Sequence, residues 1–256
     1  MARLLSFRLF RIPVTVYPSF LLIALALGWF SGFTRFDLMA AWVVIVFVSI
    51  VVHELGHALT ARGFGAQVEV ELNGLGGLTR WGNTDAELAP GRRAIVAAAG
   101  SASGFLFGGG VWVVSQSLGP FFGLGGFAVR LVIYVNVVWG LLNWLPIRPL
   151  DGGHLLTALL AKVAPRRGEA VARVLFTVTA GLALVAAFRL QLIFVGILAG
   201  WMLLNELGMG QRRQPGVGVP TLSYEEPAPS EEPAVGDGPS DDDEIEPVGQ
   251  WPDGDE

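Results

Sequence analysis

The stretch Val51–Ala58 reads VVHELGHA and lies within an apolar run over residues 38–61. On a helix, positions i and i+4 share a face, so His53 and His57 project side by side and can hold two corners of a tetrahedral zinc. Glu54 is then placed to accept a proton from the attacking water, as the glutamate of H-E-x-x-H hydrolases does. Ionisable side chains in a run long enough to cross a bilayer are costly. This favours a functional role over the alternative, core residues of a helix bundle.

The composition is that of a membrane protein. Of the 256 residues, 52% are hydrophobic and 15% are charged, a balance that predicts several membrane spans. The lack of cysteine excludes disulfides, iron–sulfur clusters and a thiol nucleophile. Charge is segregated, because residues 215–256 hold 13 acidic residues and all 17 basic residues precede them. We therefore expect a basic membrane-embedded body followed by a disordered acidic tail over residues 211–256.

The apolar segments predict an all-α polytopic membrane protein with about six transmembrane helices. A cytoplasmic segment containing a short strand is expected over residues 1–18, and one membrane domain over residues 19–210. With a cytoplasmic N-terminus, 14 basic residues fall inside and three fall outside, which predicts that both termini are cytoplasmic. The spans are expected at about residues 19–33, 38–61, 94–118, 127–144, 171–188 and 191–205.

A small β hairpin is expected between the second and third spans. Val68, Val70 and Leu72 alternate with glutamates, a period of two that indicates a strand, and Asn73-Gly74 indicates a tight turn. The strand edge could bind an extended peptide near the membrane surface. Alternatively, the hairpin could be a structural cap over the helix ends, paired with the strand expected at residues 12–16. The two interpretations are compatible.

A second motif ends the fourth span, where residues 143–154 read NWLPIRPLDGGH. The second and fourth spans run in the same direction, so Asp151 can lie at the depth of the histidine pair. It is either a third zinc ligand, which leaves the fourth position for water, or the cap of the following helix. His154 is an alternative ligand. Asn143 could bind substrate or stabilise an oxyanion, or it could bond to a neighbouring helix.

These two motifs resemble the signatures of the site-2 proteases, which are intramembrane zinc metalloproteases. That family carries H-E-x-x-H in one helix and N-x-x-P-x-x-P-L-D-G in a later one, and both occur here in that order at residues 53–57 and 143–152. The resemblance covers about residues 9–210. The family's G-P-x-x-N-like stretch in the third helix is replaced by GSASG at residues 100–104. The chain is similar to a minimal member without PDZ or CBS domains.

The resemblance implies a specific chemistry and setting. His53, His57 and Asp151 would bind Zn²⁺, Glu54 would be the general base, and Asn143 would assist at the substrate. The second, third and fourth spans would form the catalytic core of a multi-pass cell-membrane protein. Its activity would be the hydrolysis of a peptide bond in or near the transmembrane segment of another protein. The partners would be that substrate and the lipid bilayer, with no nucleic acid bound directly; the oligomeric state stays open.

Two other classes of function compete with this one. A non-catalytic metal-binding transporter or scaffold would carry polar residues along several spans, whereas here they concentrate in two motifs. A pseudoprotease would usually lose Glu54 or a ligand, and the sequence retains all of them. Both alternatives are therefore disfavoured.

Overall fold

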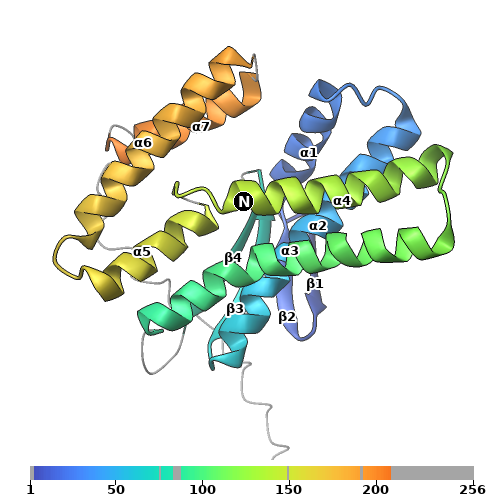
Figure 1. The fold of residues 1–256 in the computed structure, drawn as a ribbon. Coiled ribbons are helices and arrows are strands. Elements are labelled where there is room, and N and C mark those ends of the chain that lie inside the picture. The colour runs from blue at the N-terminus through green and yellow to red at the C-terminus, as the bar shows by residue number, and fades with distance from the viewer. Residues whose placement is uncertain (1–2, 75, 83–87, 149, 191–192, 209–256) are drawn as a thin grey trace, which may run out of the picture. The chain divides into compact units, whose positions relative to one another are not determined.

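The computed structural model describes residues 3–74, 76–82, 88–148, 150–190 and 193–208 (Figure 1). The acidic tail predicted at residues 211–256 lies outside them. A mainly helical chain with a small sheet is observed, in agreement with the predicted class. The order of the elements is β1 Leu5–Leu9, β2 Ile12–Val16, α1 Pro18–Phe30, α2 Phe36–Gly63, β3 Gln67–Asn73, β4 Gly76–Gly82, α3 Pro90–Leu118, α4 Gly123–Asn143, α5 Asp151–Val163, α6 Gly168–Arg189 and α7 Ile193–Glu206.

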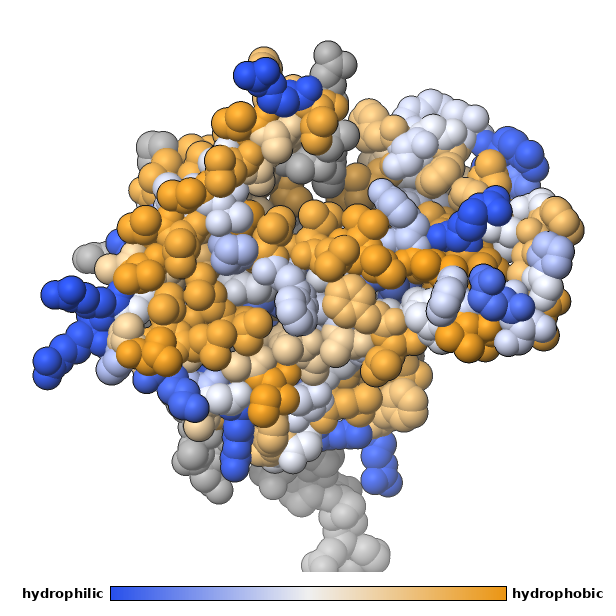
Figure 2. All heavy atoms as spheres, in the orientation of Figure 1, coloured by the Kyte–Doolittle hydropathy of each residue, from blue (hydrophilic) through white to orange (hydrophobic). Residues whose placement is uncertain are grey.

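Among the described residues, four helices are long and apolar enough to cross a membrane: α2, α3, α4 and α6. The other two predicted spans are shorter, because α1 has 13 residues and α7 has 14. At 1.5 Å per residue, either helix is about 20 Å long, less than the hydrocarbon thickness of about 30 Å. Of the six expected spans, four therefore correspond to helices of spanning length among the described residues. Figure 2 shows hydrophobic residues over most of one face, with the most hydrophilic residues mainly towards its margins.

The sheet is larger than the hairpin expected from the sequence. The described strands form a four-stranded sheet in the order β1-β2-β3-β4. Strand β2 pairs with β1 and, in parallel, with β3, so that Val14 lies opposite Val70. Strands β3 and β4 pair antiparallel, with Val70 opposite Thr79. The alternation predicted for β3 is observed, because Val68, Val70 and Leu72 are buried.

The sheet packs on α2, and this contact places β4 next to the H-E-x-x-H motif. The main hydrophobic cluster contains Val14, Val70 and Leu72 from the sheet together with Leu55 and Ala58 from α2. All five residues are buried. Because Leu55 and Ala58 belong to the same turns of α2 as the motif, the sheet fixes the orientation of that segment.

Helices α2, α3 and α4 pack against one another pairwise. Small residues permit a close approach, since a Cβ on Gly56 of α2 would lie 2.5 Å from the Ala99 carbonyl oxygen of α3. Between α2 and α4, the buried Asn136 amide donates a hydrogen bond of 2.9 Å to Ser49 Oγ. This arrangement brings the middle of α2 against both neighbouring helices.

The second motif leads into a helix, α5, that the list of spans did not include. Helix α5 packs against both α3 and α6. Ile147, in the loop before α5, forms a buried cluster with Ala180 of α6 and Met202 of α7. Arg148 forms an ion pair of 2.9 Å with Glu169 at the start of α6 and lies over the Phe176 ring. The loop that carries the second motif is therefore held by both α3 and the α6–α7 pair.

Candidate metal centre

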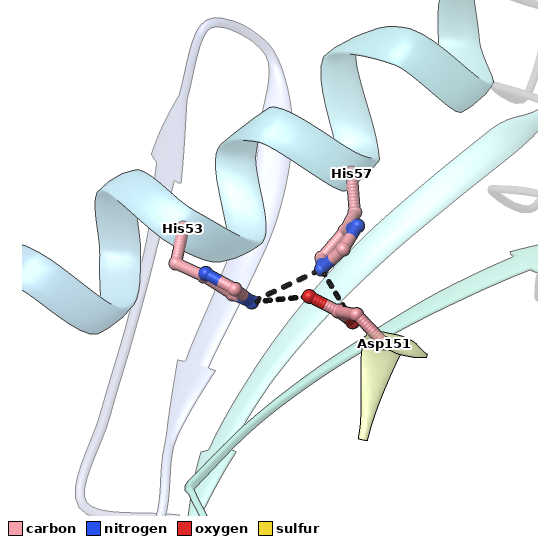
Figure 3. A group of neighbouring side chains, drawn as sticks. All are labelled: His53, His57 and Asp151. Atoms are coloured by element: carbon pink, nitrogen blue, oxygen red, sulfur yellow. Dashed lines mark hydrogen bonds and ion pairs between the residues drawn. The ribbon is translucent and has the colours of Figure 1, made fainter. Parts of the chain in front are cut away.

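Three side chains from two distant parts of the chain meet between α2 and α5. His53 and His57 lie one turn apart on α2, and Asp151 lies in the first turn of α5 (Figure 3). All three point towards one another, and their ligand atoms lie within 4.8 Å of one another. Among the described residues, this is the group of His, Asp and Glu side chains that could hold a metal ion.

The distances between these atoms fit a tetrahedral metal site. Asp151 Oδ2 lies 3.1 Å from His53 Nε2, and Asp151 Oδ1 lies 3.2 Å from His57 Nε2. The two Nε2 atoms are 3.2 Å apart. Zinc bonds of about 2.0–2.1 Å place tetrahedral neighbours about 3.3 Å apart, which is close to the distance between the two Nε2 atoms and between each of them and the Asp151 oxygen that it faces. A fourth position remains for a non-protein ligand, as in catalytic zinc sites.

The backbone around Asp151 explains why this carboxylate faces the histidines. Asp151 follows the N-cap residue, Leu150, and the N-cap makes no side-chain hydrogen bond, so the alternative in which Asp151 caps the helix is not observed. A Cβ on Gly153 would lie 2.7 Å from the Ile147 carbonyl oxygen, and one on Gly152 would overlap the Trp144 carbonyl. The double glycine therefore permits a tight turn of the loop against the start of α5.

The surroundings of the Asp151 carboxylate favour its ionised form. Burial alone would raise its pKa, but the neighbouring imidazoles of His53 and His57 outweigh burial and hold the pKa well below its usual range. Ser101 Oγ of α3, which is fully buried, donates a further hydrogen bond of 3.4 Å to Asp151 Oδ2. An ionised carboxylate with fixed orientation is the form that binds a metal.

Helix α3 orients the two histidines. His57 Nδ1 lies 2.7 Å from the Val96 carbonyl oxygen, so this nitrogen donates and leaves Nε2 free to face Asp151. A Cβ on Gly100 would lie 2.8 Å from His53 Nε2 and would overlap His57 Nε2. Only glycine lets the α3 backbone approach the pair this closely. The roles of Gly100 and Val96 were not predicted. The sequence feature that indicates a close helix contact here is the run of small residues AAAGS at residues 97–101.

Glu54 lies on the same turn of α2 but faces the sheet. Its side chain is buried, and Thr79 Oγ1 of β4 donates a hydrogen bond of 2.7 Å to Glu54 Oε2. A Cβ on Gly77 would overlap the Glu54 carboxylate. The contacts of Glu54 with Thr79 and Gly77 were not predicted, because they depend on strand pairing that the local sequence does not specify.

Asn143 lies at the edge of the group. Its side chain is buried at the end of α4, and Nδ2 lies 3.4 Å from His53 Nε2. Asn143 is therefore beside the group of side chains that could hold a metal ion. His154, the alternative ligand, lies one turn further along α5 and does not belong to the group that could hold a metal.

Helices long and apolar enough to cross a membrane surround two histidines and an aspartate that could hold a metal ion. The profile of peptidase family M50 matches residues 41–129 and 125–187, more than half of the chain. The chain therefore belongs to peptidase family M50, and its assignment to the site-2 proteases is confirmed.

Two curated relatives and one solved structure are similar to this chain. Zinc metalloprotease MJ0392 of Methanocaldococcus jannaschii is 29% identical over 164 residues, which cover 61% of this chain and 46% of that protein. The protein sll0528 of Synechocystis is 28% identical over 228 residues, or 80% of this chain and 58% of that protein. The chain thus spans about half the length of these curated relatives. The site-2 protease structure from Methanocaldococcus jannaschii shares the fold, with a TM-score of 0.60, 23% identity, and coverage of 82% of this chain and 95% of that one.

Proposed function

We propose that this chain is a zinc-dependent intramembrane endopeptidase that cleaves a peptide bond in or near the transmembrane segment of another protein. The observation that carries the proposal is the cluster of His53, His57 and Asp151, in which neighbouring side chains approach to 3.1–3.2 Å and the two histidines lie on a helix able to cross a membrane. Membership of peptidase family M50 supports the proteolytic activity. The name of the MJ0392 relative supports zinc as the metal.

The three clustered side chains would hold the metal, and the remaining residues would act on the substrate. When bound, Zn²⁺ supplies Lewis-acid polarisation of the scissile carbonyl and acidifies a water molecule. Glu54 would accept a proton from the attacking water and deliver it to the departing amine. Asn143, whose amide lies 3.4 Å from His53 Nε2, would donate a hydrogen bond to the substrate carbonyl as negative charge develops on it.

A substrate helix must unwind locally before cleavage, because a carbonyl hydrogen-bonded within a helix is not free for attack. The edge of the strand at residues 68–72 was the expected binding place for the unwound substrate segment. In the sheet this strand, β3, lies between β2 and β4, so it is not an edge strand and that expectation is wrong. Within the part of the chain that the structure describes, β4 has no strand on its outer side and lies against Glu54, so its edge is the better candidate.

The membrane setting follows from the apolar helices and the family. We propose a multi-pass protein of the cell membrane with both termini in the cytoplasm, because most basic residues then fall on the cytoplasmic side. The partners are a transmembrane substrate protein and the lipid bilayer. The chain has no cysteine, so variants with a single cysteine introduced near either terminus can test this orientation. The cysteine is labelled in spheroplasts with a maleimide that does not cross the membrane. Labelling of a terminal cysteine from outside would contradict it.

The test of the activity compares purified wild type with Glu54→Gln. The reporter has one transmembrane helix weakened at its centre by a glycine–proline pair and carries a tag at each end. We expect the zinc-loaded wild type to cleave it, and Glu54→Gln to lose at least about a thousandfold in kcat while keeping its zinc. Undiminished cleavage by Glu54→Gln, or no cleavage by the wild type, would contradict the proposal.

The metal assignment has a test of its own. Zinc content measured by mass spectrometry should be about one per chain in the wild type and strongly reduced in His57→Ala and Asp151→Ala. Loss in His57→Ala with full retention in Asp151→Ala would remove Asp151 from the ligand set.

A further inference from the structure

Strand β4 places a polar residue inward and an apolar residue outward. Leu78 is 43% exposed, whereas its neighbour Thr79 is buried against α2. A strand packed on a helix usually buries its apolar side chains, and a buried hydroxyl needs a hydrogen-bond partner. The inversion therefore indicates that the Thr79 hydroxyl has a specific partner at this position.

The partner is the Glu54 carboxylate. Thr79 Oγ1 lies 2.7 Å from Glu54 Oε2 and 3.1 Å from the Glu54 main-chain oxygen. A hydroxyl has one proton to donate, and the shorter contact to the charged acceptor is the stronger of the two. The hydroxyl therefore bonds to the side chain of Glu54, and the main-chain contact is secondary.

The surroundings leave this carboxylate little freedom. Glu54 is buried, and the backbone of Gly77 lies so close that a Cβ there would overlap the carboxylate. Thr79 is itself fixed by the sheet, because it pairs with Val70, which is 1% exposed. The carboxylate is thus held between a strand backbone on one side and a hydroxyl of the same strand on the other.

We propose that Thr79 is a positioning residue that orients the Glu54 carboxylate for proton transfer; this inference rests on the proposed endopeptidase function. Proton transfer to a base depends on the orientation of its acceptor oxygen, and a hydrogen bond to Glu54 Oε2 fixes the plane of the carboxylate and with it the position of Oε1. The hydrogen bonds of the Thr79 hydroxyl go to Glu54. Its effect is exerted through Glu54.

A purely structural role makes a different prediction. If Thr79 only joined β4 to the α2 backbone, its loss would loosen the sheet and lower stability. If it orients Glu54, its loss would leave the fold, the zinc site and substrate binding intact and would slow turnover alone. Valine has nearly the shape of threonine without the hydroxyl, and serine keeps the hydroxyl without the methyl group, so the two variants separate these roles.

The experiment compares Thr79→Val, Thr79→Ser and a matched control, Thr15→Val. Thr15 is a half-buried threonine of the neighbouring strand β2, whose hydroxyl lies 3.4 Å from Ser6 Oγ. The reporter with one destabilised transmembrane helix is used to measure kcat and KM. Zinc content and the thermal unfolding temperature are measured on the same preparations.

For Thr79→Val we expect kcat to fall about 10- to 100-fold, with KM within about twofold of wild type. Zinc content and unfolding temperature should match those of Thr15→Val. Thr79→Ser should retain at least about a third of the wild-type kcat, and Thr15→Val should retain all of it.

Three results would overturn the inference: wild-type kcat in Thr79→Val, a loss in Thr79→Ser as large as in Thr79→Val, or loss of zinc in Thr79→Val. The Glu54→Gln variant separates this failure from failure of the proposed function. If Glu54→Gln is inactive and Thr79→Val is fully active, only the role of Thr79 is wrong. If Glu54→Gln is fully active, the endopeptidase assignment itself is wrong.

Discussion

Two elements approach the same two turns of α2 from different sides, and each does so through a glycine. Helix α3 approaches the metal-ligand side, where Gly100 lies against His53 and His57. Strand β4 approaches the other side, where Gly77 lies against Glu54. Helix packing therefore determines the geometry of the ligands, and the sheet determines that of the base.

The two contacts differ in how much polar support they provide. On the α3 side, the Val96 carbonyl and the Ser101 hydroxyl bond to His57 and Asp151, at 2.7 and 3.4 Å. On the β4 side, the support is the Thr79 hydroxyl at 2.7 Å from Glu54. Changes on the α3 side should therefore affect metal binding and everything that depends on it. Changes on the β4 side should affect turnover with the metal retained.

The largest effect is expected for Gly100→Ala. Its Cβ would overlap His57 Nε2 and lie 2.8 Å from His53 Nε2, so α3 or the histidines must move. Displacement of ligand atoms by a few tenths of an ångström disrupts a tetrahedral site, and we expect zinc content to fall at least about tenfold and cleavage to be lost.

The control for Gly100→Ala is Gly109→Ala, on the same helix, where an added Cβ meets nothing within 4 Å. It should keep its zinc and gain up to about 1 kcal/mol in helix stability. Full zinc occupancy in Gly100→Ala would show that α3 does not limit the ligand geometry.

A smaller and more selective effect is expected for Gly77→Ala. The added methyl group would push the Glu54 carboxylate away from its place beside β4. We expect kcat on the transmembrane reporter to fall about 10- to 100-fold, because an acid–base group contributes about 10²–10⁴-fold and is here displaced, not removed.

The zinc content of Gly77→Ala should equal that of wild type, since the substitution does not touch the side of α2 that carries His53 and His57. The control is Gly63→Ala, at the end of α2, where the added Cβ has nothing within 4 Å; it should behave as wild type. If Gly77→Ala lost zinc as Gly100→Ala does, the division of α2 into two independently supported sides would be wrong.

The difference between the two sides also explains what the sequence could predict. The spacing of His53 and His57 follows from the helical period alone, and the strand at residues 67–73 follows from its alternation. Asp151 could be proposed because two histidines leave a zinc site incomplete. Each of these inferences uses a pattern that lies within a few residues.

What could not be predicted depends on contacts between distant segments. The pairing of the hairpin with the strand at residues 12–16 was one of the expected arrangements and is observed, but its parallel direction and its register, residues 14 and 70, have no local signal. The same holds for Thr79 beside Glu54, because its place depends on the register of β3 with β4. Helix α5 was expected only as a helix that Asp151 could cap, and its extent was not predicted, because the prolines before it and the glycines in its first turn indicate a loop and the helix is short and amphipathic.

The smallest effect is expected for Ser101→Ala, which removes one supporting contact from the ligand side. The hydroxyl donates to Asp151 Oδ2 over 3.4 Å, a long hydrogen bond, and Asp151 keeps both histidine contacts. Loss of an outer-shell partner typically weakens metal binding about 10- to 100-fold, and the length of this bond places the effect at or below about tenfold. Competition with a chelator of known zinc affinity measures it. Ser103→Ala is the matched control, since its hydroxyl bonds to main-chain oxygens of Val52 and Gly100 and not to a ligand. Equal zinc affinities for wild type and Ser101→Ala would show that the two histidines and the α3 backbone already suffice to orient Asp151.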